Sequence, residues 1–329
     1  MARGDPRVKE SRMAASIHIG TSDLQIAPLA LGTNVFGWTA DRAATFDVLD
    51  AYVAGGANFV DTADGYSHWV EGNTGGESET LIGEWIVERG ARDRVTIATK
   101  VSTHPQFEGL AGANVRAAAD ASLTRLQTDH IDLYYAHFDD AGTPLEETVA
   151  AFSELVDAGK VRAIAISNYT AERATEWFEI ARAGGYHLPV ALQPHYSLVE
   201  RGYETNGLRA VAEAEQLAVF PYYALARGFL TGKYRAASDA AAPGASPRAA
   251  GAAAYLDERG TRVLAALDEI AATHEAEVAT VALAWLRQQP TVAAPIASAR
   301  TAEQLSALLA SLELELNADE LVALDRASE

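Results

Sequence analysis

Four side chains capable of acid–base chemistry follow short apolar runs, in the order Asp61, Tyr66, Lys100 and His137. An ammonium ion favours the phenolate form of a nearby tyrosine, so Lys100 should lower the pKa of Tyr66 from about 10 toward neutrality. Tyr66 could then donate a proton to a carbonyl oxygen, while Asp61 keeps Lys100 charged and oriented. A neutral His137 could donate a hydrogen bond to the same oxygen. These residues predict carbonyl reduction. The alternative is a buried Asp–Lys pair that braces the fold, with Tyr66 and His137 as rim packing.

Short hydroxyl and amide side chains follow the next two apolar runs. Ser167 and Asn168 close one run, and Gln193 closes the following one. Their donors and acceptors suit the carboxamide of a nicotinamide ring. Asn168 could instead cap the next helix, but Thr170 can take that role and leave Asn168 free.

Cations and glycines occur together in the last third of the chain. Residues 225–234 contain Gly228 with the cations Arg227 and Lys233, which suits a pyrophosphate, although the segment lacks the Gly-Lys-Ser/Thr ending of a P-loop. Arg300 precedes a predicted helix whose first amides can bind an anion. Its guanidinium could contact a 2′-phosphate in a bidentate manner, or it could be a solvated surface charge.

Aromatic residues in loops are candidates for a substrate pocket. Phe36, Trp38, Trp69 and the pair His195-Tyr196 could line an apolar pocket, although Trp38 could equally pack at the rim. The polar segment 67–75 could admit a hydrophilic substrate or be an uninvolved surface loop.

These candidates lie on a regular alternation of apolar runs and segments with helical spacing. The apolar runs predict strands at residues 29–31, 59–61, 95–99, 131–136, 161–166, 190–192, 219–222 and 292–295. The other segments predict helices at residues 42–55, 77–88, 114–126, 144–158, 171–183, 208–217, 257–274, 278–287 and 302–309. Eight strand–helix units predict an α/β fold with a closed parallel sheet, a (β/α)8 barrel.

A β-hairpin over residues 17–26 precedes the first of these strands. A doubly wound open sheet is the competing fold, but no Gly-x-Gly-x-x-Gly follows the first strand. The candidate residues all lie at the ends of predicted strands, where such barrels carry their active sites. Residues 235–254 are rich in alanine, glycine, serine and proline and predict a mobile loop on the same face.

Composition narrows the class of protein. The 329 residues carry a formal net charge of -19, which argues against nucleic acid and anionic membrane as partners. The absence of cysteine excludes disulfides, thiol catalysis and cysteine metal sites, and we expect no bound metal. No run approaches the length of a membrane span. Residues 1–16 lack the apolar core of a secretory signal, so we expect a loose extension followed by one cytoplasmic barrel domain over residues 17–329.

In this order, Asp61, Tyr66, Lys100 and His137 resemble the catalytic tetrad of the aldo-keto reductase family. The resemblance runs from about Ile17 to the C-terminus. Its further motifs are Gly76-Glu-Ser-Glu79, Ser167-Asn168-Tyr169, Gln193-Pro-His-Tyr196, Gly228-Phe-Leu-Thr-Gly-Lys-Tyr234 and Ala299-Arg300-Thr301. It implies a TIM barrel plugged at the bottom by a hairpin. It also implies NADPH-dependent reduction of an aldehyde or ketone, with Tyr66 as proton donor.

The resemblance also assigns binding residues. It implies that Tyr222 stacks on the nicotinamide ring and that the polar residues after strands five and six hold its carboxamide. Gln304 and Leu308 stand where the family often has arginine and asparagine, and these departures argue against a preference for the phosphate of NADPH. Because Arg300 can still contact that phosphate, we favour NADPH and keep NADH as the second candidate. The implied cofactor-binding residues are Thr33, Asn34, Asp61, Ser167, Asn168, Gln193, Tyr222, Ala224, Leu225, Arg227, Gly228, Lys233, Ile296, Ser298, Ala299, Arg300 and Gln304. The substrate-binding candidates are Phe36, Trp38, Tyr66, Trp69 and His137.

Two other functions compete with carbonyl reduction. The resembling family includes channel-associated members, so one alternative is a cofactor-binding regulatory subunit with little turnover. The other is a barrel aldolase that uses Lys100 as a Schiff base, but it leaves Ser167, Asn168 and Gln193 without a role. We expect a small-molecule carbonyl substrate as the partner, and a monomer or weak homo-oligomer.

Overall fold

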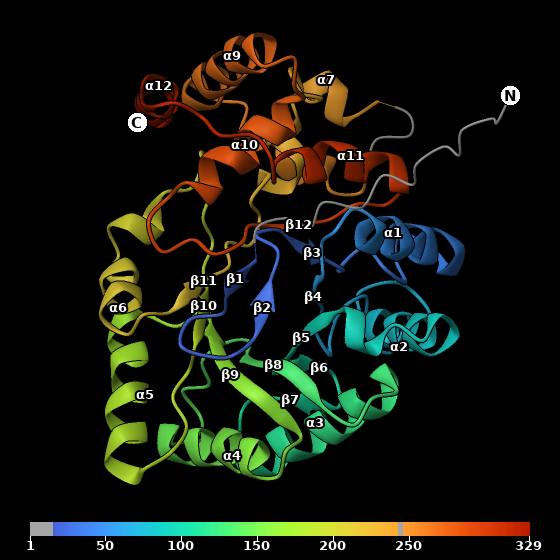
Figure 1. Cartoon of the computed structure of the whole chain (residues 1–329), viewed down its shortest axis with the longest axis vertical. Helices are drawn as coiled ribbons and strands as arrows, with labels where there is room; N and C mark the ends of the chain where they lie inside the picture. Colours follow the sequence, from blue (N-terminus) through green and yellow to red (C-terminus); the bar gives the residue numbers. More distant parts are fainter. Residues whose placement is uncertain (1–15, 243–245) are drawn as a thin grey trace, which may run out of the picture.

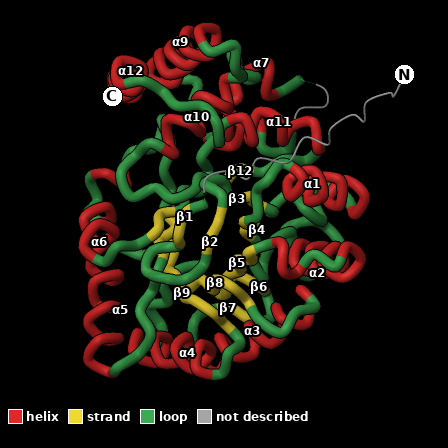
Figure 2. The backbone as a smooth tube through the Cα atoms, in the orientation of Figure 1, coloured by secondary structure: helices red, strands yellow, loops and turns green. Residues whose placement is uncertain are grey.

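A computed structural model describes residues 16–242 and 246–329. Eight parallel strands form one sheet in the order β11-β10-β9-β8-β5-β4-β3-β12. The sheet closes because Val219 of β11 bridges in parallel to Val292, and Ala293 N donates to Val219 O at 2.9 Å. Helices surround this sheet, so the chain is a (β/α)8 barrel, as predicted (Figure 1; Figure 2). The predicted extension lies outside the described residues except for Ser16.

Within residues 16–242 and 246–329, the barrel and its hairpins use twelve short strands. They are β1 Ile17–His18, β2 Gln25–Ile26, β3 Ala30–Gly32, β4 Phe59–Asp61, β5 Thr96–Val101, β6 Thr103–His104, β7 Phe107–Glu108, β8 Ile131–Ala136, β9 Val161–Ser167, β10 Ala191–Gln193, β11 Ala218–Val219 and β12 Ile296–Ala297.

The α-helices are α1 Arg42–Ala54, α2 Glu77–Arg89, α3 Gly112–Leu126, α4 Leu145–Asp157, α5 Ala171–Gly184, α6 Leu208–Ala214, α7 Ala237–Ala240, α8 Ala249–Ala253, α9 Glu258–Thr273, α10 Val278–Arg287, α11 Ala302–Ala310 and α12 Ala318–Ser328. Short 3-10 helices lie at Arg92–Arg94, Gly202–Glu204 and Ala226–Thr231. Within the described residues, no helix is long and apolar enough to cross a membrane.

Two apolar cores follow from the alternation of side chains along each strand. The outward positions pack against the helices, and the inward positions fill the barrel. The predicted hairpin forms as β1 pairs with β2 in antiparallel register, and it lies at the centre of the ring of helices in Figure 1. Its Ile19, Leu24 and Ile26 join Phe59 and Leu133 in the inner core, so the hairpin closes one end of the barrel. Functional side chains must therefore gather at the opposite end.

Polar side chains at helix N-termini fix where several helices begin. Asp41 caps α1 by accepting from Ala44 N at 2.9 Å, and Asp257 caps α9 by accepting from Gly260 N at 2.6 Å. The predicted cap Thr170 does begin α5, accepting from Arg173 N at 3.3 Å, so Asn168 is free of that role. These bonds satisfy amides that have no partner inside the helix.

The structure corrects several details of the predicted elements. The last strand lies at Ile296–Ala297 rather than 292–295, because Pro295 contributes its carbonyl to Ala30 N while Ile296 and Ala297 pair with β3. Strand seven ends at Val219 rather than at residue 222. The hairpin β6–β7 and the helix α12 were not predicted. Within 235–254, the described residues include the helices α7 and α8, and α8 buries Ala249 and Ala252.

Candidate active site

The strand register brings the predicted catalytic side chains together. On β4 and β5, Phe59 and Ala98 point into the barrel, so Asp61 and Lys100, each two residues further on, point the same way. Both lie where their strands end, at the face opposite the hairpin plug. His137 directly follows β8 and is held there by its N–H, which donates to Val101 O at 3.0 Å.

Lys100 is the centre of the hydrogen-bond network. Its ammonium donates to Asp61 Oδ2 at 2.7 Å, to Thr62 O at 2.6 Å and to Tyr66 Oη at 3.1 Å. All three donors of the ammonium are therefore used. The side chain of Lys100 is 0% exposed and that of Asp61 is 3% exposed, so the ion pair is buried. Gln193 Nε2 donates to the other carboxylate oxygen of Asp61 at 2.9 Å.

Burial and neighbouring charges set the pKa values of Lys100 and Tyr66. Burial alone would lower the pKa of Lys100. The negative charge of Asp61, and after it Tyr66, have the larger effect, so the pKa of Lys100 lies above its ordinary value. Lys100 is therefore an ammonium ion with no lone pair for a Schiff base, which argues against the aldolase alternative. The prediction that the pKa of Tyr66 is lowered is wrong. Burial raises the pKa of its phenol above 10, and Lys100 only partly opposes this. Tyr66 is thus a protonated phenol that can donate its proton.

His137 lies beside Tyr66, with ring centroids 6.2 Å apart. Burial first and Lys100 second hold the pKa of His137 well below 6.5, so the imidazole is neutral. Its Nδ1 is buried and has no hydrogen-bond partner among the described residues. A neutral ring with one N–H can donate a hydrogen bond to a carbonyl oxygen.

The polar residues after β9 and β10 form one connected layer. Asn168 Nδ2 donates to His137 O at 2.8 Å and to Ser167 Oγ at 3.1 Å. Ser167 Oγ donates to Gln193 O at 2.9 Å, and Tyr222 Oη donates to Asn168 Oδ1 at 2.8 Å. Asn168 has a left-handed φ of 57°, a conformation that asparagine tolerates better than most residues. The layer fixes a wall of amide and hydroxyl groups beside the catalytic residues.

Tyr222 is joined to this wall by the hydrogen bond from its hydroxyl to Asn168. His195 stacks against it with ring centroids 5.2 Å apart and an interplanar angle of 15°. Burial raises the pKa of Tyr222 to about 12, so it is a neutral phenol. A ring fixed by stacking and by a hydrogen bond at its hydroxyl is suited to pack against a second flat ring.

These groups line one cavity of about 650 Å³. The predicted site residues that line it are Asn34, Asp61, Tyr66, Trp38, Trp69, His137, Ser167, Asn168, Gln193, Tyr222, Ala224, Leu225, Arg227, Gly228, Lys233, Ile296, Ser298, Arg300 and Gln304. Six predicted residues do not line it: Thr33, Phe36, Lys100, His195, Tyr196 and Ala299. The predicted pocket role of His195 and Tyr196 is therefore wrong, because His195 stacks on Tyr222 and Tyr196 is buried, with its hydroxyl donating to Glu204 Oε1 at 2.6 Å. Lys100 lies directly behind Asp61 and Tyr66 and acts through them.

Thr33, Phe36 and Ala299 are buried parts of the scaffold. Thr33 is 0% exposed, and its hydroxyl donates to the backbone carbonyl of Asp61 at 3.0 Å. Phe36 is also 0% exposed, so its ring packs in the outer core and its backbone carbonyl accepts from Ser67 Oγ at 2.7 Å. Ala299 is buried beneath the start of α11. These residues position the loops that carry the site.

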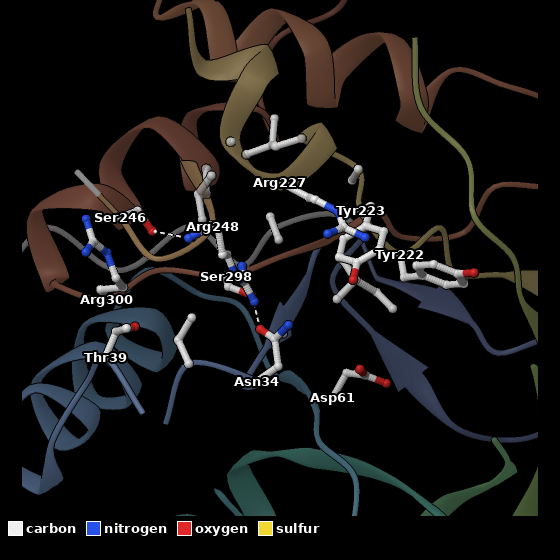
Figure 3. A pocket seen from close by; sticks show the side chains of 18 of the residues that line it. Asn34, Thr39, Asp61, Tyr222, Tyr223, Arg227, Ser246, Arg248, Ser298 and Arg300 are labelled. Atoms are coloured by element: carbon white, nitrogen blue, oxygen red, sulfur yellow. Dashed lines mark hydrogen bonds between the residues drawn. The ribbon is translucent and has the colours of Figure 1, made fainter. Parts of the chain in front are cut away.

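Four cations line the cavity, and none forms an ion pair within the described part of the chain: Arg227, Lys233, Arg248 and Arg300. Figure 3 shows the three arginines following one another from Arg300 through Arg248 to Arg227. Burial first, then Arg300 and Arg248, lower the pKa of Lys233, which reports the mutual repulsion of this group. In a chain of net charge -19, unpaired cations around one cavity indicate an anionic ligand.

The backbone beside these cations is strained. Tyr223, Ala226 and Arg227 have φ values of 53°, 46° and 58°, and Gly228 has 96°. Left-handed conformations of residues other than glycine are costly and gather at functional sites. Arg227 lies over the Tyr223 ring at 4.6 Å, so the strained turn holds a cation against an aromatic face.

Arg300 and Gln304 form the start of α11 together. Arg300 N donates to Gln304 Oε1 at 2.9 Å, so the Gln304 side chain ties the residue before the N-cap Thr301 to the first turn of α11. In the same loop, Ser298 Oγ donates to Asn34 Oδ1 at 3.0 Å (Figure 3). Arg300 lines the cavity, and the side chains of Gln304, Ser298 and Asn34 around it are held by these hydrogen bonds.

The sequence predictions missed several cavity residues, above all Arg248. Arg248 lies over Trp38 at 5.8 Å and comes from the segment that was predicted as a mobile loop. A cation within an alanine-rich segment after strand seven was a usable signal, because that segment belongs to the active face. Tyr223 and Phe138 were also missed, although each directly follows a predicted site residue.

Aromatic rings surround the cavity next to Tyr66. Trp38 and Trp69 meet edge to face with centroids 5.7 Å apart, and Trp69 lies 6.4 Å from the Tyr66 ring. Trp69 is 47% exposed and Phe138 is 45% exposed, which is unusual for side chains of this size. Half-exposed rings at the rim of a cavity provide an apolar surface for a ligand.

Known proteins resemble this chain over nearly its full length. The sequence profile of the Aldo/keto reductase family matches residues 28–329. Protein Tas of Escherichia coli (strain K12) is 34% identical over 337 residues, covering 92% of this chain and 94% of Tas. Norsolorinic acid reductase stcV of Emericella nidulans is 33% identical over 319 residues, covering 92% of this chain and 78% of the reductase. The oxidoreductase YrpG of Bacillus subtilis (strain 168) is 34% identical over 309 residues, covering 91% of each chain.

Proposed function

The chain belongs to the aldo/keto reductase family and is therefore an oxidoreductase, and from this premise we propose that it reduces an aldehyde or ketone with NADPH. The family typically uses nicotinamide cofactors. The observation that carries the proposal is the contact of Lys100 with both Asp61 and Tyr66, at the wall of a cavity with four unpaired cations. We also propose a cytoplasmic monomer or weak homo-oligomer whose barrel domain spans residues 17–329.

The catalytic residues divide the work of adding two hydrogen atoms to a carbonyl group. When bound, the reduced nicotinamide supplies a hydride to the carbonyl carbon. Tyr66 donates its phenolic proton to the carbonyl oxygen, and the Lys100 ammonium, 3.1 Å away, stabilises the phenolate that remains. Asp61 balances the buried charge of Lys100. His137 donates a hydrogen bond to the oxygen on which negative charge develops, so the products are an alcohol and the oxidised cofactor.

The cavity residues fit a dinucleotide. Ser167, Asn168 and Gln193 offer amide and hydroxyl groups for the carboxamide, and Tyr222 offers a fixed ring face for the nicotinamide. The cations suit the pyrophosphate and a further phosphate. Because Arg300 lies at the start of α11, we assign it to the 2′-phosphate, and this assignment supports NADPH over NADH.

The substrate end of the cavity is aromatic. Trp38, Trp69 and Phe138 lie around Tyr66 and His137, so we propose an apolar aldehyde or ketone that packs on these rings. A purely regulatory role is less favoured, because the proton donor, its lysine and the carboxylate are already in hydrogen-bond contact.

A panel of aromatic and aliphatic aldehydes and ketones, assayed with each cofactor, tests the proposal. We expect oxidation of NADPH in proportion to the alcohol formed, faster with aromatic than with small hydrophilic aldehydes, and slower with NADH. Absence of alcohol from every compound, while NADPH still binds, would instead support the regulatory alternative.

A further inference from the structure

We propose that Asp64 is a positioning residue whose carboxyl is buried in its protonated form, so that the turn that carries Tyr66 packs closely against the end of β5. Asp64 is absent from the proton transfer described above, and the inference rests on the proposed role of Tyr66. It extends that role by naming what holds the phenol at its distance from Lys100.

Asp64 lies between the two strands that supply the catalytic residues. Its backbone N–H donates to the carbonyl of Lys100 at 3.1 Å, and Thr62 N donates to Ala98 O at 2.8 Å, so residues 62–64 run alongside β5. The next residue, Gly65, lies directly on the chain after β5. A Cβ at Gly65 would lie 2.8 Å from the carbonyl oxygen of Thr103 and would also overlap its hydroxyl. Any shift of this turn therefore moves Tyr66 relative to Lys100.

The side chain of Asp64 is fully buried with few polar contacts. The residue is 0% exposed, and its Oδ2 has no hydrogen-bond partner among the described residues. Its Oδ1 has only a long contact of 3.5 Å from Thr103 Oγ1. An ionised carboxylate in such surroundings would lose its hydration without replacement, whereas a neutral carboxyl has far less to lose.

The charged groups near Asp64 do not provide a partner for an anion. Glu79 of α2 is itself buried and accepts from Arg125 Nε at 2.6 Å and from Thr99 Oγ1 at 2.5 Å, so the charge of Arg125 on α3 is already paired. Tyr134 of β8 is fully buried, and its hydroxyl has no partner within the described part of the chain. A negative charge on Asp64 would therefore be repelled by Glu79.

The pKa of Asp64 agrees with this geometry. Burial first and Glu79 second raise it to about 8, while Arg125 and the amides of Gly65 and Ser102 oppose the rise. His104 of β6 is also neutral, because burial and Arg125 lower its pKa. The carboxyl is thus protonated at pH 7 and ionises above about pH 8. Tyr66 cannot account for an inflection there, because its own pKa lies above 10.

The variant Asp64→Asn tests both halves of the proposal, since an amide imitates the neutral carboxyl but does not titrate. A carboxyl with a raised folded pKa makes the folded state lose stability as pH rises from about 4 to about 8. The melting temperature of Asp64→Asn should therefore fall less than that of wild type between pH 5 and pH 9. The control Asp47→Asn, which removes an exposed carboxylate of α1, should leave the wild-type slope unchanged. A wild-type slope in Asp64→Asn would overturn the protonated state.

The pH dependence of carbonyl reduction tests whether Asp64 positions Tyr66. At pH 9, one unit above the midpoint, about one-tenth of a carboxyl remains protonated, so wild-type turnover should be roughly tenfold lower than at pH 7. Asp64→Asn should keep its pH 7 turnover and lose this alkaline fall. If the fall persists in the variant, the positioning role is wrong. Absence of turnover in wild type would overturn the proposed function and this role together, but not the protonated state.

A measurement on wild type alone guards against poor folding of the variant. The infrared carbonyl band of a buried protonated carboxyl should be present at pH 7 and disappear with a midpoint near pH 8. A wild-type spectrum without such a titration would contradict the inference without use of any variant.

Discussion

Replacement of Lys100 should leave the buried carboxylate of Asp61 without its partner and lower the stability of the fold. Lys100 Nζ lies 2.7 Å from Asp61 Oδ2 and both side chains are buried, so at an effective dielectric constant of about 20 their attraction is about 6 kcal/mol. In Lys100→Met, Asp61 keeps only the donor Gln193 Nε2 at 2.9 Å. Loss of one partner of a buried pair costs about 3–5 kcal/mol.

In Lys100→Met, Asp61 can take up a proton instead of remaining a buried carboxylate without its partner, so the cost of this protonation is an upper bound to the loss of stability. A carboxyl that has a pKa of about 3.9 when unfolded and stays protonated when folded loses about 4 kcal/mol of stability at pH 7, and about 1.5 kcal/mol at pH 5. The double variant Lys100→Met with Asp61→Asn has no carboxylate to protonate. It should therefore unfold at higher denaturant concentration than Lys100→Met, by a margin that grows from pH 5 to pH 7.

Chemical denaturation followed by circular dichroism measures this margin. The exposed pair Arg116–Glu154, with N and O atoms 2.8 Å apart, provides the control. Because water screens this pair, Arg116→Met should give a much smaller change with little dependence on pH. Equal stability of the single and double Lys100 variants, or a margin that does not change with pH, would refute the buried ion pair.

Three further predictions concern the cofactor, the histidine and the turn. Arg300→Ala should weaken NADPH by about 1.5–3 kcal/mol, the range for hydrogen bonds to charged groups, with little effect on NADH. Titration by tryptophan fluorescence checks this, and a parallel loss for both cofactors would show that Arg300 only shapes the loop. Because the pKa of His137 lies well below 6.5, turnover should show no inflection near pH 6.5, and such an inflection lost in His137→Gln would contradict a neutral ring. Gly65→Ala should lower the melting temperature, because its Cβ would lie 2.8 Å from the Thr103 carbonyl oxygen, and an unchanged melting temperature would mean that the turn yields easily.

Much of the site was predictable because strand ends are visible in the sequence. An apolar run that ends in Asp61, Lys100 or His137 places these side chains at one face of a closed parallel sheet, whatever the details of the loops. The same reasoning placed Ser167 and Gln193, although the strands β9 and β10 include both residues. Their backbone groups complete the pairing of β9 with β10, which no composition signal reveals.

The missed features depend on packing in three dimensions. Phe36 is aromatic and lies in a loop, but only the structure shows that its ring turns into the outer core. Arg248 is separated from Arg300 by α8, α9, α10 and β12, so its place beside Arg300 depends on how the chain after strand seven folds back. The pKa of Tyr66 was predicted from its charged neighbour alone, and burial reverses the direction.

Proton donation by Tyr66 is the central claim, and the reduction of an aldehyde by NADPH in the variant Tyr66→Phe tests it most directly. The phenylalanine ring keeps the packing against Trp69 and removes only the hydroxyl that Lys100 contacts. We predict a loss of turnover of at least ~100-fold, the lower range for acid catalysis, with NADPH affinity nearly intact. Turnover close to that of wild type would contradict the account.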